Sequence, residues 1–165
     1  MDAALAFALR AVAIGTGATL VLDAWALVLA RAYGVRPADW ALVGRWVGHW
    51  RRGRFAHQAI AAAAPVRGER WLGWAFHYAT GVVFAAVLLA ACGPEWARAP
   101  TWPPCLIVGV LTVVFPMLVM QPAMGGGVAS SKAADPAQAR LRSLVTHAVF
   151  GVGLYLAARC TALLA

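Results

Sequence analysis

The sequence predicts an all-α fold: an integral-membrane four-helix bundle with an interfacial amphipathic helix in its first cytoplasmic loop. Of the 165 residues, 62% are hydrophobic and only 12% are charged, far from the composition of soluble globular domains. Four apolar stretches are also long enough to cross about 30 Å of hydrocarbon, which takes roughly 20 helical residues. Each must be a helix, because lipid cannot satisfy an open backbone. We expect a single transmembrane domain over residues 1–165, with spans at about 11–30, 71–92, 104–124 and 143–164.

The positions of the basic residues predict how these spans are oriented. Most of them lie in the loops 31–70 and 125–142, whereas the loop 93–103 holds only Arg98. The positive-inside rule therefore makes the two basic loops cytoplasmic and both termini periplasmic, in a bacterial inner membrane. The net charge of +8 comes without any nucleic-acid-binding motif, so we expect no nucleic-acid partner.

The loop 31–70 is too long for a simple connection and contains the interfacial helix. Its apolar residues recur at helical spacing: Trp40, Val43, Trp46, Val47 and Trp50. Such a helix lies on a leaflet with its arginines against anionic headgroups. The arginines expected to make these contacts are Arg45, Arg51, Arg52 and Arg54. A gate over the cytoplasmic mouth of the bundle is the alternative.

One polar side chain interrupts each apolar span. These are Asp23, His77, Gln121 and His147. Such groups are costly in hydrocarbon, so they face the bundle interior and often mark function. Small residues one or two helical turns away, such as Thr19 and Gly15 before Asp23 and Gly151 after His147, indicate close contacts with other helices. Helical rise places all four groups in the cytoplasmic half, where they form the candidate site.

The residue types at this site allow several kinds of chemistry. Two histidines, a carboxylate and a carboxamide could bind a divalent metal, or a haem iron through the histidines. Met120 lies in the same region and adds copper(I) to these cofactors. The candidate metal ligands are therefore His77, His147, Asp23 and Met120. The same groups could instead relay protons, or only hold helices together by hydrogen bonds.

Three further candidates lie in the first cytoplasmic loop: His49, His57 and Glu69, of which His57 is the better one. His57 could extend the site, because its segment leads back toward the second span, and Glu69 stands at the start of that span. For Glu69, an ion pair with Arg67 or Arg70 is the simpler alternative. His57 could likewise face solvent or headgroups.

The third span is interrupted near its inner end. Pro116 should kink the helix, and Pro122 followed by the glycines at 125–127 should end it. Broken helix ends that face a cavity often bind ions in membrane proteins, and a plain flexible turn is the alternative. Near the outer face, Cys92 and Cys105 either pack as small apolar residues or form a disulfide, a choice that the sequence leaves open.

Six blocks along the chain resemble the signature of a known family. The blocks are 19–25 (TLVLDAW), 40–49 (WALVGRWVGH), 53–57 (GRFAH), 68–78 (GERWLGWAFHY), 120–127 (MQPAMGGG) and 147–155 (HAVFGVGLY). They are similar to a family of short bacterial inner-membrane proteins described as a domain of unknown function. The resemblance implies a four-span integral membrane protein, mostly of proteobacteria. It assigns no activity and no residue role.

Three function classes follow from these residues. The leading hypothesis is a membrane-embedded site that binds a metal or haem, or relays protons. The second is a small proton-coupled transporter, which would need a homodimer because four helices rarely enclose a pathway alone. The third is a non-catalytic membrane adaptor that works through the basic, tryptophan-rich loop. Whether the protein is an enzyme is left open.

Overall fold

The computed structural model describes residues 2–164, which contain helices and no strand. Four helical segments are long and apolar enough to cross a membrane. They are α1 (Ala3–Tyr33), α3 (Glu69–Arg98), the segment Trp102–Met124, and α6 (Pro136–Leu163). The predicted all-α class with four long apolar helices is thus confirmed.

The remaining elements are short. A helix in the first long loop, α2 (Trp40–His49), confirms the helix expected there. The third apolar segment consists of α4 (Trp102–Leu111), a π-helical turn η3 (Pro116–Met120) and α5 (Gln121–Met124). Single 3-10 turns are η1 (Trp50–Arg52), η2 (Ile60–Ala62) and η4 (Val128–Ser130).

The chain forms two compact units. Unit 1 consists of residues 1–37, 78–112 and 145–165, of which 2–164 are described, and unit 2 consists of residues 38–77 and 113–144. Unit 1 is a bundle of four helices, because it takes in α1, most of α3, α4 and most of α6. Unit 2 holds α2, the first turns of α3, and the interrupted end of the third apolar segment.

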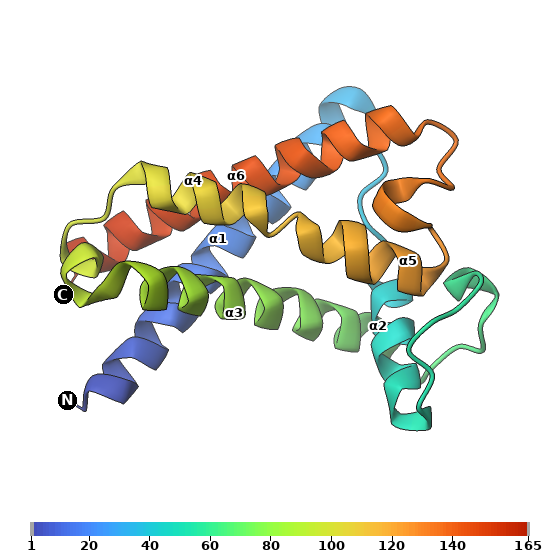
Figure 1. Ribbon diagram of the computed structural model, residues 1–165, viewed down its shortest axis with the longest axis horizontal. Coiled ribbons are helices and arrows are strands. Elements are labelled where there is room, and N and C mark those ends of the chain that lie inside the picture. The colour runs from blue at the N-terminus through green and yellow to red at the C-terminus, as the bar shows by residue number, and fades with distance from the viewer. Residues whose placement is uncertain (1, 165) are drawn as a thin grey trace. The chain divides into compact units, whose positions relative to one another are not determined.

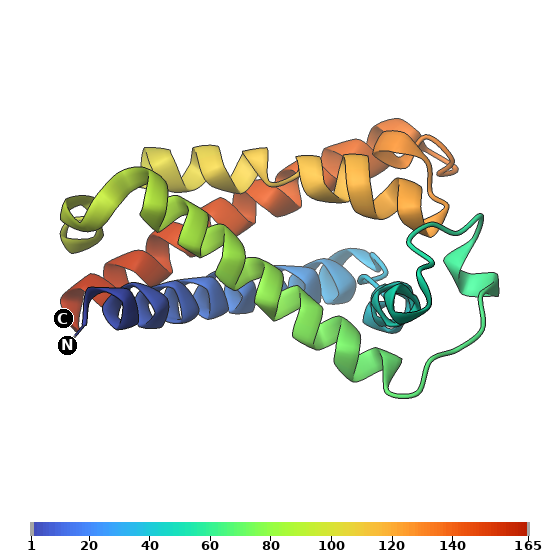
Figure 2. The same ribbon diagram turned by 60° about the horizontal axis from the view of Figure 1, so that its bottom comes forward.

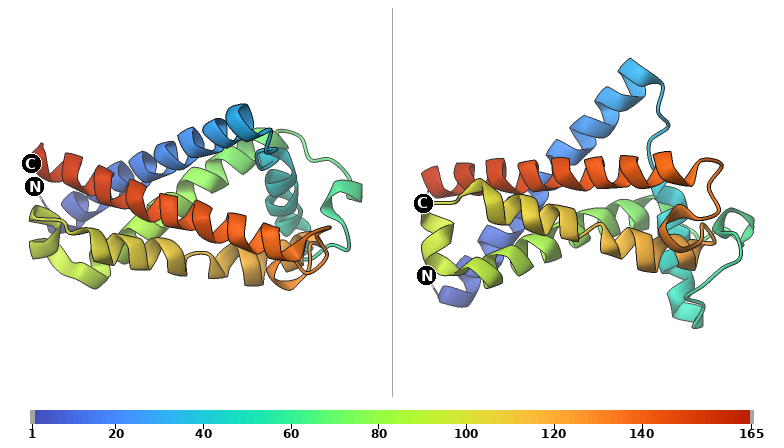
Figure 3. Two further views of the ribbon diagram at one scale, coloured as in Figure 1. Left: turned by 90° about the horizontal axis from the view of Figure 1, so that it is seen from above. Right: turned by 45° about the horizontal axis from the view of Figure 1, so that its top comes forward.

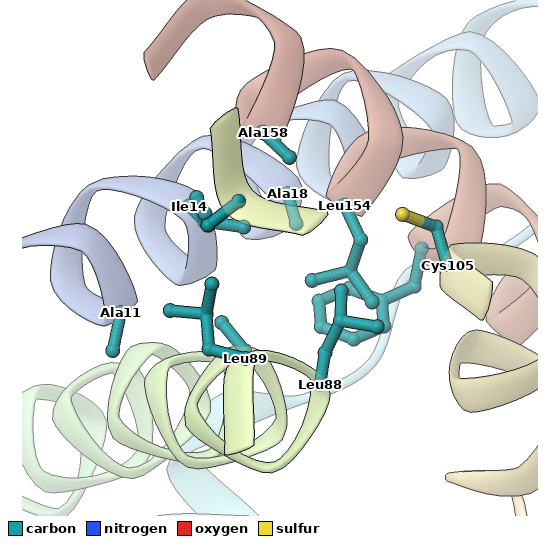
Figure 4. Packing of buried hydrophobic residues seen from close by; sticks show 11 residues of the cluster. Ala11, Ile14, Ala18, Leu88, Leu89, Cys105, Leu154 and Ala158 are labelled. Atoms are coloured by element: carbon teal, nitrogen blue, oxygen red, sulfur yellow. The ribbon is translucent and has the colours of Figure 1, made fainter. Parts of the chain in front are cut away.

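The core of unit 1 is built from small and branched apolar side chains of all four helices. Ile14 and Ala18 of α1 meet Leu88 and Leu89 of α3 and Leu154 of α6 (Figure 4). Figure 2 shows α6 approaching α4 toward the end of α4. An apolar core of this kind packs helices through van der Waals contact, which is the main attraction between helices in lipid.

Glycines bring the helices of unit 1 close together. A Cβ atom at Gly15 of α1 would overlap the backbone of Val82 in α3. One at Gly109 of α4 would likewise overlap the backbone of Gly151 in α6. The prediction that small residues mark close helix contacts is therefore confirmed at Gly15 and Gly151.

Two glycines also set the main crossing in unit 2. Figure 1 shows α2 running across the first turns of α3. At the crossing, a Cβ atom at Gly44 would overlap the carbonyl of Glu69, and one at Gly73 would overlap the carbonyl of Trp40. Trp46 of α2 is also buried in the unit, with its ring against the edge of Phe76 in α3. Part of the apolar stripe of the expected interfacial helix therefore packs inside the protein.

Prolines and glycines interrupt the long helices. The non-helical φ of +80° at Gly93 breaks α3 ahead of Pro94, so that its regular part ends near the predicted boundary. In the third segment α4 ends at Leu111, and Pro116 begins a π-helical turn, because proline lacks the N–H that would continue the helix. The expected interruption at Pro116 is thus confirmed. Among the described residues the three cysteines, Cys92, Cys105 and Cys160, are free thiols.

Candidate functional site

The four polar side chains of the apolar spans divide between the two units. Asp23 and His147 belong to unit 1, and His77 and Gln121 belong to unit 2. In unit 1 the hydroxyl of Tyr78 donates a hydrogen bond of 2.8 Å to Oδ2 of Asp23. Nδ1 of His147 lies 2.8 Å from Oγ1 of Thr112. These contacts join α1 to α3 and α4 to α6.

The two polar groups of unit 2 also have partners. The ring of His77 stacks on Trp40, with 3.9 Å between ring centroids, and meets the edge of Trp74. Oε1 of Gln121 accepts a 3.0 Å hydrogen bond from Ser130. That all four polar groups form one shared layer stays a prediction.

The metal hypothesis finds no support in the arrangement of side chains. Within residues 2–164, no group of three or more His, Cys, Asp or Glu side chains could hold a metal ion. Met120 lies in the π-helical turn η3, half-buried. His57 and Glu69, the secondary candidates, each form defined side-chain hydrogen bonds.

His57 forms a pair with His49, a residue at the end of α2. Nε2 of His57 lies 2.7 Å from Nδ1 of His49, and Nε2 of His49 lies 3.0 Å from the carbonyl oxygen of Ala64. His49 is only 2% exposed. The two rings and the carbonyl thus form a chain that begins in the interior of unit 2 and ends at His57.

The hydrogen bonds of this pair determine its tautomers. A carbonyl oxygen only accepts, so Nε2 of His49 must carry a hydrogen. In a neutral His49 ring, Nδ1 then has a lone pair and accepts from Nε2–H of His57. In a neutral His57 ring, Nδ1 is therefore left without a hydrogen. That Nδ1 atom is buried and makes no hydrogen bond to any part of the described chain.

The surroundings of His57 favour its neutral form. Burial lowers the pKa of His57 below its usual value, the nearby His49 and Arg54 lower it further, and the backbone carbonyl of Ala123 opposes them with a smaller effect. At neutral pH the ring is therefore uncharged, with the Nδ1 lone pair free to accept a hydrogen bond or a proton. A buried polar atom without a partner costs about 1–3 kcal/mol, and among the described residues Nδ1 of His57 shares this state with the indole N–H groups of Trp25 and Trp50.

An ion pair fixes the segment that follows His57. Arg45 donates from Nε and Nη2 to the two carboxylate oxygens of Glu69, at 2.9 and 2.8 Å. Its Nη1 also donates to the carbonyl oxygens of Ala61 and Ala63, at 3.1 Å each. The partner of Glu69 is thus Arg45 of α2, in place of Arg67 or Arg70.

This arrangement changes the role of Arg45. Its side chain is only 13% exposed, and the hydrogen bonds to Glu69 raise its pKa above the ordinary value for arginine. These hydrogen bonds hold the guanidinium of Arg45 inside unit 2. The expectation of contacts with anionic headgroups therefore rests on Arg51, Arg52 and Arg54, which are all exposed.

The glycine-rich end of the third apolar segment contacts the backbone of His57 and of the next residue, Gln58. The backbone N–H of His57 donates a 2.8 Å hydrogen bond to the carbonyl of Ala123. A Cβ atom at Gly125, where φ is +95°, would overlap the carbonyl of Gln58. The close approach that the glycines were expected to offer a ligand is therefore made, at Gly125, by the chain itself.

The turn after these glycines is strained. Ala129 and Ser130 have φ values of +48° and +57°, which are unfavourable for residues with a Cβ atom. The hydroxyl of Ser130 bonds to Gln121, and Arg140 donates a 2.8 Å hydrogen bond to the carbonyl of Ala129. These bonds hold a conformation that would otherwise cost roughly 1–2 kcal/mol per residue. Gln121 is thus a structural partner of the turn.

Reasoning from the sequence did not predict how His57 is held. His49 was a possible extension of the site, without a predicted bond to His57, and Arg45 was expected to contact headgroups. The available signal was the His49-x7-His57 spacing across a Gly53 turn, together with Glu69 at the start of the next helix. Pairing across 24 residues, as between Arg45 and Glu69, leaves no periodic pattern.

The fold and the sequence place this chain in a class of helical proteins with four helices able to span a membrane. The chain belongs to the family described as "Protein of unknown function (DUF2938)", whose pattern matches residues 12–161. This confirms the resemblance noted from the sequence blocks. No curated protein and no solved structure matches the chain.

Proposed function

We propose that this protein provides an acid–base site at a membrane surface, in which Nδ1 of His57 accepts a hydrogen bond or a proton from a small polar molecule. The observation that carries the proposal is the buried, unpartnered Nδ1 atom of His57. Buried polar atoms in native proteins normally have partners, and an exception often belongs to a functional site. A ligand with an O–H or N–H group would satisfy this atom.

His49 acts as the positioning residue of the pair. Its Nε2–H is bonded to the carbonyl of Ala64, so it presents Nδ1 as an acceptor to His57. If Nδ1 of His57 takes up a proton, the Nε2 proton of His57 can pass to Nδ1 of His49. The positive charge is then shared by two rings, and His49 keeps its bond to Ala64. General bases in proteins are commonly oriented by such a second group.

Access to Nδ1 requires the covering segment to move. Within residues 53–59 every residue other than His57 is exposed, and the segment has no helix or strand. Few backbone hydrogen bonds hold it, including those of Arg54 to the carbonyl of His49 and of His57 to that of Ala123. Segments with few buried contacts open at low free energy, so a small molecule can reach the ring.

Proton acceptance fits the geometry better than the other hypotheses. A metal ion held by side chains alone would need further ligands beside His57, and residues 2–164 contain no suitable group of three His, Cys, Asp or Glu side chains. Within the described residues of either unit, no contact favours haem binding, transport through a homodimer or an adaptor role. A base held by a second histidine needs no additional group.

Acylation with diethyl pyrocarbonate tests this proposal, because unprotonated imidazole nitrogens react with this small electrophile. The intact protein in mild detergent is treated near neutral pH, and the modified histidines are located by mass spectrometry. We expect an adduct on His57 and none on His49, whose nitrogens are both occupied. Denatured protein, in which both rings are free, gives the reference reactivity. An unreactive His57 in the folded protein would overturn the proposal.

A further inference from the structure

The segment around His57 is strongly basic on its exposed side. Arg51, Arg52 and Arg54 are exposed, and within the described chain none of them forms an ion pair. Figure 3 shows that the segment between α2 and α3 forms an open loop beside α2. Three free guanidinium groups within four residues attract an anion, and arginine suits the oxygens of a phosphate.

An apolar side chain stands among these charges. Phe55 lies between Arg54 and His57 in sequence and is 60% exposed. Exposed aromatic and cationic side chains together are typical of protein segments that lie at a lipid headgroup region. The anion that meets this surface is therefore expected to be part of a lipid.

Two buried polar atoms near the basic segment lack partners in residues 2–164. One is Nδ1 of His57, an acceptor, and the other is Nε1–H of Trp50, a donor. These residues flank the three arginines in sequence and belong to the same unit. A headgroup with a hydroxyl donor satisfies Nδ1 of His57, whereas a headgroup without a hydroxyl leaves it unpaired.

We propose that the molecule bound here is an anionic phospholipid whose phosphodiester headgroup carries a free hydroxyl, as in phosphatidylglycerol. The arginines bind the phosphodiester, Phe55 lies among the first acyl carbons, and the hydroxyl donates to Nδ1 of His57. This inference rests on the acid–base site proposed above and names its ligand. The proposed site distinguishes headgroups of equal charge by the presence of a free hydroxyl group.

The test compares lipids that differ only in that hydroxyl. The full-length protein in detergent is titrated with phosphatidylglycerol, and separately with phosphatidylmethanol, which has the same charge and no free hydroxyl. Bound lipid is counted by native mass spectrometry. We expect phosphatidylglycerol to bind about fivefold to tenfold more tightly, as one hydrogen bond to a buried acceptor implies. Equal affinities would overturn the proposal.

Matched variants separate the contributions of hydroxyl and charge. His57→Phe keeps an aromatic ring and removes the Nδ1 acceptor, so the preference should vanish while phosphatidylmethanol binds as before. Arg54→Gln should weaken both lipids equally. Arg159→Gln, an exposed arginine of α6 in unit 1, should change neither. A preference that persists in His57→Phe would contradict the assigned contact.

Two further measurements keep the proposal testable if a variant fails to fold. In the unaltered protein, phosphatidylglycerol should protect His57 from diethyl pyrocarbonate, and phosphatidylmethanol should not. Soluble glycerol 3-phosphate should neither bind nor protect, and binding by it would mean that the site takes a free phosphate ester. If His57 is reactive but shows no lipid preference, the lipid assignment fails and the acid–base site stands. If His57 is unreactive without lipid, the acid–base site itself fails.

Discussion

Removing the guanidinium of Arg45 should open the segment that carries His57. In Arg45→Gln, the carboxylate of Glu69 loses two charge-assisted hydrogen bonds and keeps the one from the backbone N–H of Val66, at 2.9 Å. The carbonyls of Ala61 and Ala63 lose their bonds as well. Breaking a buried ion pair from one side costs about 3–5 kcal/mol. The exposures of 13% and 18% reduce this to about 2–3 kcal/mol, since partial solvation screens the pair.

Hydrogen–deuterium exchange read by mass spectrometry measures this loss where it occurs. A decrease of about 2 kcal/mol in local stability corresponds to roughly 30-fold faster exchange of the amides over residues 60–69. Arg98→Gln is the control, because Arg98 pairs with Glu95 at the same 2.8 Å but with exposures of 67% and 81%. In Arg98→Gln, the local stability of the segment around residue 98 should change by less than about 0.5 kcal/mol. If Arg45→Gln exchanges no faster than the control, our account of the ion pair is refuted.

Three other predictions concern the crossing of α2 and α3, the polar pair of unit 1 and the effect of pH. Gly73→Ala should lower the melting temperature in detergent, because its methyl group overlaps the carbonyl of Trp40 and such overpacking costs about 1–3 kcal/mol. Tyr78→Phe removes the hydrogen bond to Asp23, so the free energy of unfolding in denaturing detergent should fall by about 0.6–1.7 kcal/mol. The lowered pKa of His57 means that below pH 6.5 the unfolded chain binds a proton that the folded chain does not. Stability should therefore decrease as the pH falls from 6.5 toward the folded pKa, by at most about 1.4 kcal/mol per pH unit, and less in His57→Gln.

Local sequence patterns predict the helical architecture of this protein well. Length and hydropathy alone place the four apolar helices, because a bilayer admits few other structures. Pro116 and Gly93 mark interruptions through well-known backbone effects. The contacts of Gly15 and Gly151 follow from small residues near polar ones. These features depend on neighbours in sequence.

The site depends on contacts between distant parts of the chain. The bond from His57 to Ala123 joins residues that periodicity cannot relate. Arg45 has the sequence context of an exposed interfacial residue, yet its guanidinium is satisfied inside unit 2. The polar side chains in the spans were the predicted site because such groups are costly in lipid. The hydrogen-bonded pair of His49 and His57 involves a loop instead. Binding and catalytic residues often lie on loops that a helical scaffold positions.

The protonation of the two ring nitrogens of His57 tests the central claim most directly. Nitrogen NMR of the protein labelled with ¹⁵N-histidine, assigned with His57→Gln, distinguishes protonated from unprotonated imidazole nitrogens. Our account predicts that His57 at neutral pH has a protonated Nε2 and an unprotonated Nδ1, and that His49→Phe, which removes the acceptor for Nε2–H, abolishes this fixed tautomer. A protonated Nδ1 on His57 in the folded protein would contradict the account, because that atom would then have no lone pair to offer a ligand.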